Sequence, residues 1–501
     1  MTESRAIDFD DIQALARFGH GHLLQSRFLL LTIHNVVQAG KWLQQLPISC
    51  ASTQPRRPES AVQLAFTAAG IQQLGLPHSV LEQFSDEFLV GMNRDENRSR
   101  RLGDIEHNAP ENWLWGDHDS QPLHALLLLY SREDQIEDLY NQTCNGSFSQ
   151  AFQIVHELPT DLLQAKEPFG FVDGISQPEI DWHQTQRTDI HAREAYSNLL
   201  APGEIVLGYP DEYGQLIRRP LVRPESGDSD DPALRLPPAE EAPGLYDFGG
   251  NGSYLVLRQL EQDVDGFREF IKTQSNGQHE HGEALAACMV GRHRNGDPLV
   301  PPTPRDIPGI PAASHHNHFD YDADPAGLQC PLGSHVRRSN PRTGDFPPGS
   351  SSLWIRLLRM LGFKRRSTHE DLVASSRFHR ILRRGRIYNN AGLQFICVGS
   401  NIRRQFEFVQ SAWSVSSTFA GTREQRDPLI GHRQPRIDGS TTSSFLLPGE
   451  SGAQTRIREL PTFVTVRGGG YFFMPGLRAV RYLAYLAEHS NENRCTGEVE
   501  S

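Results

Sequence analysis

The stretch Phe28-Leu-Leu-Leu-Thr-Ile33 and the segment 36–46 behind it decide the fold class. The first is an apolar run of strand length, and the second repeats its apolar residues with helical spacing. Further elements are expected as strands at 62–66, 123–130 and 152–155 and as a helix at 133–140. The resulting order is β-α-β-β-α-β, which predicts a ferredoxin-like α+β unit over the first 160 residues.

The remainder of the chain repeats this alternation. Strands are expected at 254–257, 380–388, 393–398, 463–467 and 471–474, and helices at 264–272, 402–413 and 477–488. We therefore predict two ferredoxin-like units with antiparallel sheets and peripheral helices, divided into residues 1–160 and 161–501. The second unit carries two inserts. Residues 224–243, rich in Pro, Asp and Glu, are expected to form a solvated loop, and residues 349–368 contain a short basic amphipathic helix.

Composition excludes several classes of protein. The 501 residues include 61 acidic and 49 basic side chains, a net charge of -12, which argues against a general nucleic-acid binder. No apolar run reaches the about 20 residues needed to cross a membrane. The six cysteines have no paired spacing, so neither a zinc knuckle nor a covalent haem attachment is predicted. Scattered thiols and a start without signal features predict a cytoplasmic protein.

A single acid stands between two glycines in Gly170-Phe-Val-Asp-Gly174. Glycines allow a close backbone approach to a bulky group and fix the direction of the carboxylate of Asp173. Asp-Gly is also an ordinary turn dipeptide. The motif alone therefore leaves two interpretations, a structural turn and a catalytic base.

A histidine in a basic context defines a second motif, Cys330-Pro-Leu-Gly-Ser-His335-Val-Arg-Arg-Ser-Asn-Pro-Arg342. A lone histidine is more often structural than a ligand, but neighbouring arginines suit an anionic cofactor such as a haem with two propionates.

The third motif is His379-Arg-Ile-Leu-Arg383-Arg-Gly-Arg-Ile-Tyr388. It is either an edge strand protected by charge or a strand that places an arginine in a pocket.

Together these three motifs resemble the dye-decolorising peroxidase family, the haem-dependent DyP-type peroxidases. Further segments that resemble the family are 203–214, 251–260, 392–398, 404–410 and 467–475. The resemblance implies two ferredoxin-like units, in agreement with the alternation described above. It also implies a non-covalent haem b in the C-terminal unit.

The resemblance implies a role for each motif residue. His335 is similar to the proximal axial ligand of the haem iron. Asp173 is similar to the distal acid–base and Arg383 to the distal arginine. Arg342 is a candidate partner for a haem propionate.

Three further positions are predicted with alternatives. A proximal histidine usually donates its second ring N–H to a carboxylate, and Asp427 and Glu407 are the two candidates. Phe406 and Phe408 are expected to wall the distal side, although a helical core accounts equally well for one of them.

The resulting hypothesis is a haem peroxidase that reduces hydrogen peroxide and oxidises dyes, phenolics or other aromatic reductants. The alternative is a haem-binding protein that carries haem or removes its iron, and a third is a non-catalytic interaction protein. No integral membrane segment is expected, but the amphipathic residues 353–366 are a candidate for peripheral membrane or partner contact, unless that helix lies on its own domain.

Two sets of residues have secondary interpretations. Trp354, Tyr388 and Trp413 are candidates for passing electrons from bulky dyes to a buried haem, although ordinary core or surface positions explain them as well. The cluster of His315, His316 and His318, followed by several aspartates, has the donor groups for a surface divalent metal, but it also fits a metal-free loop.

Overall fold

The computed structural model describes residues 5–54, 56–117, 121–184, 198–224, 231–301, 316–342, 376–433, 443–449 and 454–490. The predicted amphipathic helix 353–366 and Trp354 lie outside these ranges. Within them, no helix combines the length and the apolar character that crossing a bilayer requires.

The first unit follows the predicted order closely. Its strands are β1 (Gln25–Ile33), β2 (Ser60–Phe66), β3 (Ala125–Ser131) and β4 (Phe152–Leu158), and its helices include α1 (Val36–Gln45), α6 (Ile136–Thr143) and α7 (Gly146–Ala151). The strands lie in the antiparallel order β4-β1-β3-β2. Between β2 and β3 the chain forms α2 (Ala68–Gln73), α3 (His78–Leu81), α4 (Asp86–Val90) and α5 (Glu96–Leu102).

The second unit repeats this arrangement. Its main strands are β9 (Ser253–Gln262), β10 (Leu382–Arg383), β11 (Arg386–Tyr388), β12 (Gly392–Gly399) and β15 (Val464–Met474). Its helices are α9 (Val264–Gln274), α10 (His279–Val290), α11 (His335–Ser339), the π-helical turns η7 (Arg403–Glu407) and η8 (Val409–Val415), and α14 (Leu477–Glu488). The order β15-β9-β12-β10 matches that of the first unit. The predicted α+β fold of two ferredoxin-like units is therefore confirmed.

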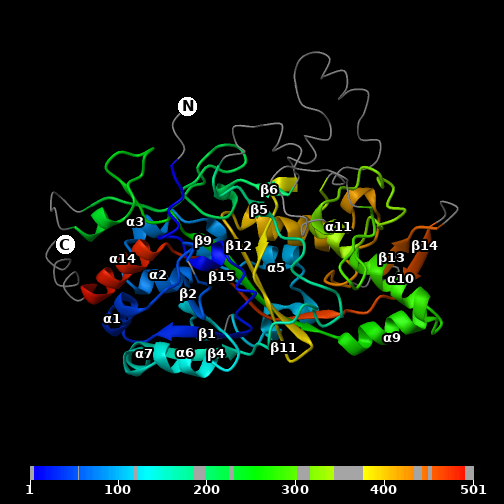
Figure 1. The fold of residues 1–501 in the computed structure, drawn as a ribbon, viewed down its shortest axis with the longest axis horizontal. Coiled ribbons are helices and arrows are strands. Elements are labelled where there is room, and N and C mark those ends of the chain that lie inside the picture. Colours follow the sequence, from blue (N-terminus) through cyan, green and yellow to red (C-terminus); the bar gives the residue numbers. More distant parts are fainter. Residues whose placement is uncertain are drawn as a thin grey trace, which may run out of the picture.

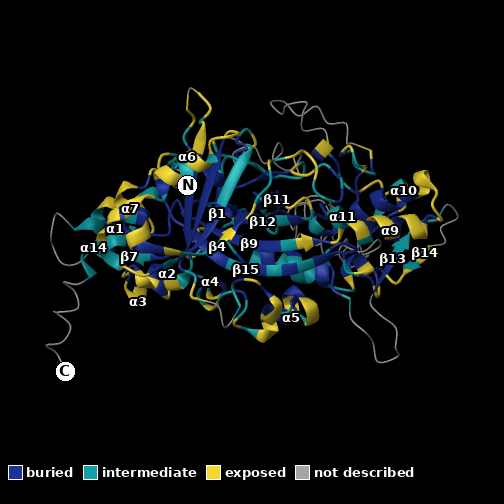
Figure 2. Ribbon diagram, turned by 90° about the horizontal axis from the view of Figure 1, so that it is seen from below, coloured by how far each residue is buried: buried dark blue, intermediate teal, exposed yellow. Residues whose placement is uncertain are grey.

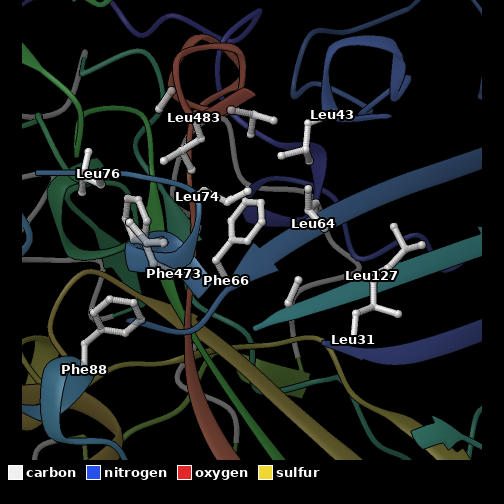
Figure 3. Packing of buried hydrophobic residues seen from close by; sticks show 14 of the residues in the cluster. Leu31, Leu43, Leu64, Phe66, Leu74, Leu76, Phe88, Leu127, Phe473 and Leu483 are labelled. Atoms are coloured by element: carbon white, nitrogen blue, oxygen red, sulfur yellow. The ribbon is translucent and has the colours of Figure 1, made fainter. Parts of the chain in front are cut away.

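The two units share one sheet and one core. The backbone pairing of Phe473 with Phe66 joins β15 to β2, which makes a continuous nine-stranded sheet (Figure 1). Figure 3 shows Phe66 and Phe473 packed together with leucines from both ends of the chain. The sheet is buried along its length, and the exposed residues concentrate on the helices around it (Figure 2).

The last helix returns to the first unit. Helix α14 packs against α1, where a Cβ on Gly40 would lie only 2.7 Å from the carbonyl oxygen of Ala484 (Figure 1). The predicted boundary near residue 160 falls just after β4, but residues 477–488 cover the unit before that boundary. Cutting the chain at 160 would therefore expose the apolar face of α14.

Several predicted elements differ in detail. Segments 463–467 and 471–474 form one strand, β15, because the pairing with β9 continues from Val464 to Met474 through a bulge between Val466 and Gly468. Beside Gly468 lies the indole ring of Trp115, with which a Cβ would collide. Segment 380–388 is divided into β10 and β11. The described part of the 224–243 insert is not a wholly solvated loop. It contains a 3-10 turn (Pro232–Arg235), and both Ala233 in this turn and Leu236 directly after it are buried.

Candidate functional site

His335 is the first residue of α11, and a buried carboxylate holds its ring. The imidazole Nδ1 lies 2.8 Å from Oδ2 of Asp427, whose side chain is fully buried. The other oxygen of Asp427 accepts hydrogen bonds from the backbone N–H groups of Leu429 and Ile430 at 2.9 and 3.0 Å. With Nδ1 occupied in this way, Nε2 is the ring nitrogen left to meet a ligand.

The electrostatics favour a charged Asp427 beside this histidine. Burial raises the pKa of Asp427, but the charge and hydrogen bond of His335, the Ile430 amide and nearby Arg338 lower it by more, so the net pKa is below its ordinary value. Burial lowers the pKa of His335, while the charge of Asp427 and its hydrogen bond raise it by more. The carboxylate thus fixes the ring orientation and increases its basicity.

Asp173 and Arg383 are brought together by the fold although 210 residues separate them. The Arg383 Nη1 donates to Oδ1 of Asp173 at 2.8 Å, and the N–H of Gly174 donates to the same oxygen at 2.6 Å. Burial raises the pKa of Asp173, but the charge of Arg383 and these bonds lower it by more. Gly170 and Gly174 have φ values of 96° and 81°, so the left-handed backbone around Asp173 accounts for both glycines.

A glutamine that the sequence analysis did not select fixes the strand of Arg383. The Gln177 side chain accepts from the backbone N–H of Arg383 at 3.0 Å and donates to its carbonyl at 3.2 Å. Gln177 lies in the turn-rich segment behind Gly174. Its position in the motif was visible in the sequence, but its partner was not, because the two residues are distant in the chain.

One large cavity connects these groups. Its volume is about 1780 Å³ including its opening to solvent, and His335, Asp173 and Arg383 all line it. The side chains of these residues are 28%, 42% and 29% exposed, which gives the cavity access to both the imidazole and the ion pair. The remaining walls are mainly apolar and include Val290, Val336, Ile381, Leu393, Phe395, Phe406 and Leu429.

The cavity has the features that a haem requires. An apolar lining suits a flat macrocycle, and Arg292 and Arg380 also line the cavity and supply positive charge for carboxylates. The amide of Asn340 and the hydroxyl of Ser414 line it as well, and both are buried without a hydrogen-bond partner among the described residues. Buried polar groups are normally satisfied, so these two positions point to a polar ligand group or ordered water.

The structure distinguishes Phe406 from Phe408 as a cavity wall, and Asp427 from Glu407 as the partner of His335. Phe406 lines the cavity, whereas Phe408 stacks on the ring of His379 with a centroid distance of 3.6 Å and belongs to the helical core. Asp427 contacts His335. Glu407 instead accepts from Tyr471 at 2.9 Å and pairs with buried Arg98 at 2.8 Å.

Arg342 does not line the cavity. Its guanidinium donates to the carbonyls of Asn317 and Phe319 and to the Asn317 side chain, at 2.9, 3.0 and 2.5 Å. These bonds hold the segment before α11, so we do not retain Arg342 as a propionate partner. Its sequence position beside α11 did not reveal that its guanidinium bonds to Asn317 and Phe319.

The first unit also contributes to the cavity, which the sequence analysis did not anticipate. Leu102, Gly103, Asp104 and Asn108 line it from the connection between β2 and β3. Asp104 forms an ion pair with Arg258 on β9, which lines the same cavity. The cavity therefore lies between the two units.

The candidates for secondary roles are dispersed. Tyr388 lines a separate hollow of about 910 Å³, together with Trp115 and Arg467. Trp413 is 3% exposed and packs near α11. His316 lies 2.9 Å from Asp297, and the described ranges contain no group of three or more side chains arranged for a metal ion.

Comparisons with known proteins point to one family. No family model matches the chain. The chain is 27% identical over 442 residues to the dye-decolorizing peroxidase msp1 of Mycetinis scorodonius, covering 85% of this chain and 76% of that protein. It is 25% identical to a dye-decolorizing peroxidase of Exidia glandulosa, covering 95% and 87%. It is 32% identical to the multifunctional dye peroxidase DyP2 of an Amycolatopsis species, covering 46% and 49%.

Solved structures agree at the level of the fold. The DyP-type peroxidase of Auricularia auricula-judae superposes with a TM-score of 0.70 at 22% identity and covers 97% of this chain and 100% of that chain. The enzyme of an Anabaena species gives a TM-score of 0.65 at 24% identity, covering 95% and 94%. With the motifs, the fold and the relatives in agreement, this chain is similar over most of its length to the dye-decolorising, or DyP-type, peroxidases, and it is an oxidoreductase of the peroxidase type.

Proposed function

We propose that this protein is a haem-dependent peroxidase that reduces hydrogen peroxide and oxidises dyes, phenolics or other one-electron donors. One observation carries the proposal: His335, oriented by buried Asp427, and the ion pair of Asp173 with Arg383 line the same apolar cavity. The relatives named above are all peroxidases, which gives the alternative of haem carriage no support.

The chain supplies the cofactor site as follows. His335 offers Nε2 to the iron, and Asp427 holds the ring in the matching tautomer. Arg292 and Arg380 are the cationic residues proposed for the two propionates, with Asn340 and Ser414 as additional polar partners. When bound, non-covalent haem b supplies the redox chemistry of the peroxidase reaction.

Asp173 is proposed as the acid–base. Its carboxylate accepts the proton from one oxygen of hydrogen peroxide and returns it to the other, which leaves as water when the O–O bond breaks. Arg383 stabilises the negative charge that develops on the separating oxygens. Overall, two electrons, taken one at a time from two reducing molecules, and two protons convert the peroxide into two molecules of water.

The ion pair explains how one side chain performs both proton steps. Because Arg383 lowers the pKa of Asp173, the carboxylate is ready to accept a proton at ordinary pH. Arg383 and Gly174 both donate to Oδ1, and within the part of the chain that the structure describes no hydrogen bond reaches Oδ2. Gln177 holds the backbone of Arg383, so the guanidinium keeps its place while the proton moves.

The test combines haem content with turnover. Asp173→Asn should retain the Soret band but lose about 10²–10⁴-fold in peroxide-dependent dye oxidation. His335→Ala should lose the haem itself. Asp265→Asn, an exposed aspartate paired with Arg268 on α9, is the matched control and should keep full activity. Undiminished turnover in Asp173→Asn would contradict the proposed acid–base, and haem binding without turnover in the wild type would favour haem carriage.

A further inference from the structure

A cluster of buried cations lies next to the strand that carries Arg383. Arg384 and Arg386 are 9% and 4% exposed. Arg384 donates to the carbonyls of Leu15 and Arg17 at 2.9 and 3.3 Å, and Arg386 donates to the carbonyl of His20 at 3.3 Å. Within the described ranges, the two guanidiniums donate to main-chain oxygens, and Arg386 also lies over the ring of Tyr130.

Unused polar atoms gather around Arg386. Its Cζ lies 5.1 Å from the ring centroid of Tyr130, and the ring of His20 lies 5.1 Å from the same ring. The Arg386 Nε, the Tyr130 hydroxyl and both ring nitrogens of His20 are buried with no hydrogen-bond partner in the described part of the chain. The side-chain oxygen of Gln394, opposite Arg386 in the β11–β12 ladder, is also unpaired there.

The backbone is shaped around this cluster. His20 has φ = 51°, a left-handed conformation that a residue with a side chain adopts only when its surroundings impose it. Tyr130 lies on β3 of the first unit and Arg386 on β11 of the second. The cluster therefore contains residues of both units.

The positive charges of Arg384 and Arg386 have no counter-charge among the described residues. A guanidinium stays charged under all ordinary conditions, and a buried charge without a counter-charge costs several kcal/mol. Burial and the two arginines lower the pKa of His20 to about 3. The histidine is therefore neutral and adds no third positive charge to the cluster. Among the described residues, neither arginine has a carboxylate as an electrostatic partner. Water can satisfy the unpaired donors, but it leaves both positive charges in place.

We propose that this cluster binds one small inorganic anion of the halide class. The ligating atoms are the Arg386 Nε–H, the Tyr130 hydroxyl and one ring N–H of His20, with Arg384 contributing long-range attraction. A monoatomic ion suits a site whose three donors are all at least nine-tenths buried. Arg384 Nη1 donates to the carbonyl of Arg383 at 3.1 Å, so the ion stabilises the segment that holds the arginine of the cavity.

Thermal unfolding of the haem-loaded full chain tests this site. Chloride or bromide replaces gluconate at constant ionic strength, with the Soret band recorded throughout. The expected result is a saturable rise in Tm with an unchanged Soret band. The rise should disappear in Arg386→Met and weaken in Tyr130→Phe, which removes a single hydroxyl and provides a second variant if Arg386→Met does not fold. Arg268→Met, an exposed arginine on α9, should keep the full rise.

Crystals grown in bromide give an independent readout. The expected result is an anomalous peak between Arg386, Tyr130 and His20. Only ordered water at this position, an absent Tm response, or an equal response in Arg386→Met would overturn the proposal. A Soret shift that accompanies the Tm response and survives in Arg386→Met would place the halide at the haem instead, which also overturns it.

Discussion

Replacing Asp427 with asparagine tests how the chain positions His335. The change removes the charge at a fully buried site and replaces one acceptor oxygen with an NH₂ group. Asparagine can still accept from the amides of Leu429 and Ile430, but it then presents N–H to the Nδ1–H of His335. The 2.8 Å bond to the histidine is therefore lost.

The structure sets the size of the effect. A hydrogen bond to a charged group contributes about 1.5–3 kcal/mol. The buried Arg338 and the partly exposed Arg433 also lose an anionic neighbour, and breaking a buried charge pair costs about 3–5 kcal/mol. We expect a total loss of about 3–5 kcal/mol, because these contributions overlap. At about 2 °C per kcal/mol for a large chain, Tm should fall by about 6–10 °C.

Haem retention separates positioning from stability alone. Loss of a group that orients a metal ligand weakens metal affinity by about 10–100-fold, so Asp427→Asn should transfer haem to an excess of acceptor globin correspondingly faster. Glu407→Gln is the matched control, because Glu407 is also buried and paired, with Arg98 and Tyr471. It should lower Tm without accelerating haem transfer. Equal haem loss in the two variants, or unchanged haem loss in Asp427→Asn, would refute the assignment of Asp427 as the partner of His335.

Three further outcomes are expected. Because Arg383 holds the pKa of Asp173 below its ordinary value of 3.8, the stabilisation from their pair is complete above that value and is lost as pH falls through the lower folded pKa. Dye oxidation should accordingly peak on the acid side of neutral, and a pH–rate profile with its optimum above pH 7 would count against Asp173 as the base. If Tyr388 and Trp413 relay electrons, the double change to phenylalanine should slow turnover of bulky dyes while sparing small phenols in steady-state assays; unchanged dye turnover would exclude both positions. Gly468→Ala should destabilise the chain by about 1–3 kcal/mol in denaturant titrations, because its Cβ collides with an indole ring, and a neutral result would show that the ring moves freely.

The order of elements could be predicted because it depends on local patterns. The apolar spacing of residues 28–33 and 36–46 specifies a strand and a helix without reference to distant parts of the chain, and α14 begins and ends at the predicted residues. Segment 402–413 was correctly expected to be helical. Its π-helical form was not foreseen, because side-chain periodicity does not distinguish that geometry.

The identities of the site residues were partly available in the same way. Glycines beside Asp173, and arginines beside His335, are chemical signatures readable along the chain. Arg342 has an equally suitable neighbourhood, yet it bonds to Asn317 and Phe319. A motif specifies which residue types are adjacent, but side-chain direction depends on what the backbone packs against.

The sequence by itself thus determined two ferredoxin-like units and a short set of reactive side chains. Only the tertiary structure decided that Asp427 rather than Glu407 meets His335, and that Asp173 and Arg383 share one cavity. These pairs are 92 and 210 residues apart, so their contact depends on how the folded chain brings α11 and β10 to the loops that carry Asp427 and Asp173. Such long-range contacts form only when the shared core closes, and the free energy of that closure comes from burial spread over the whole molecule.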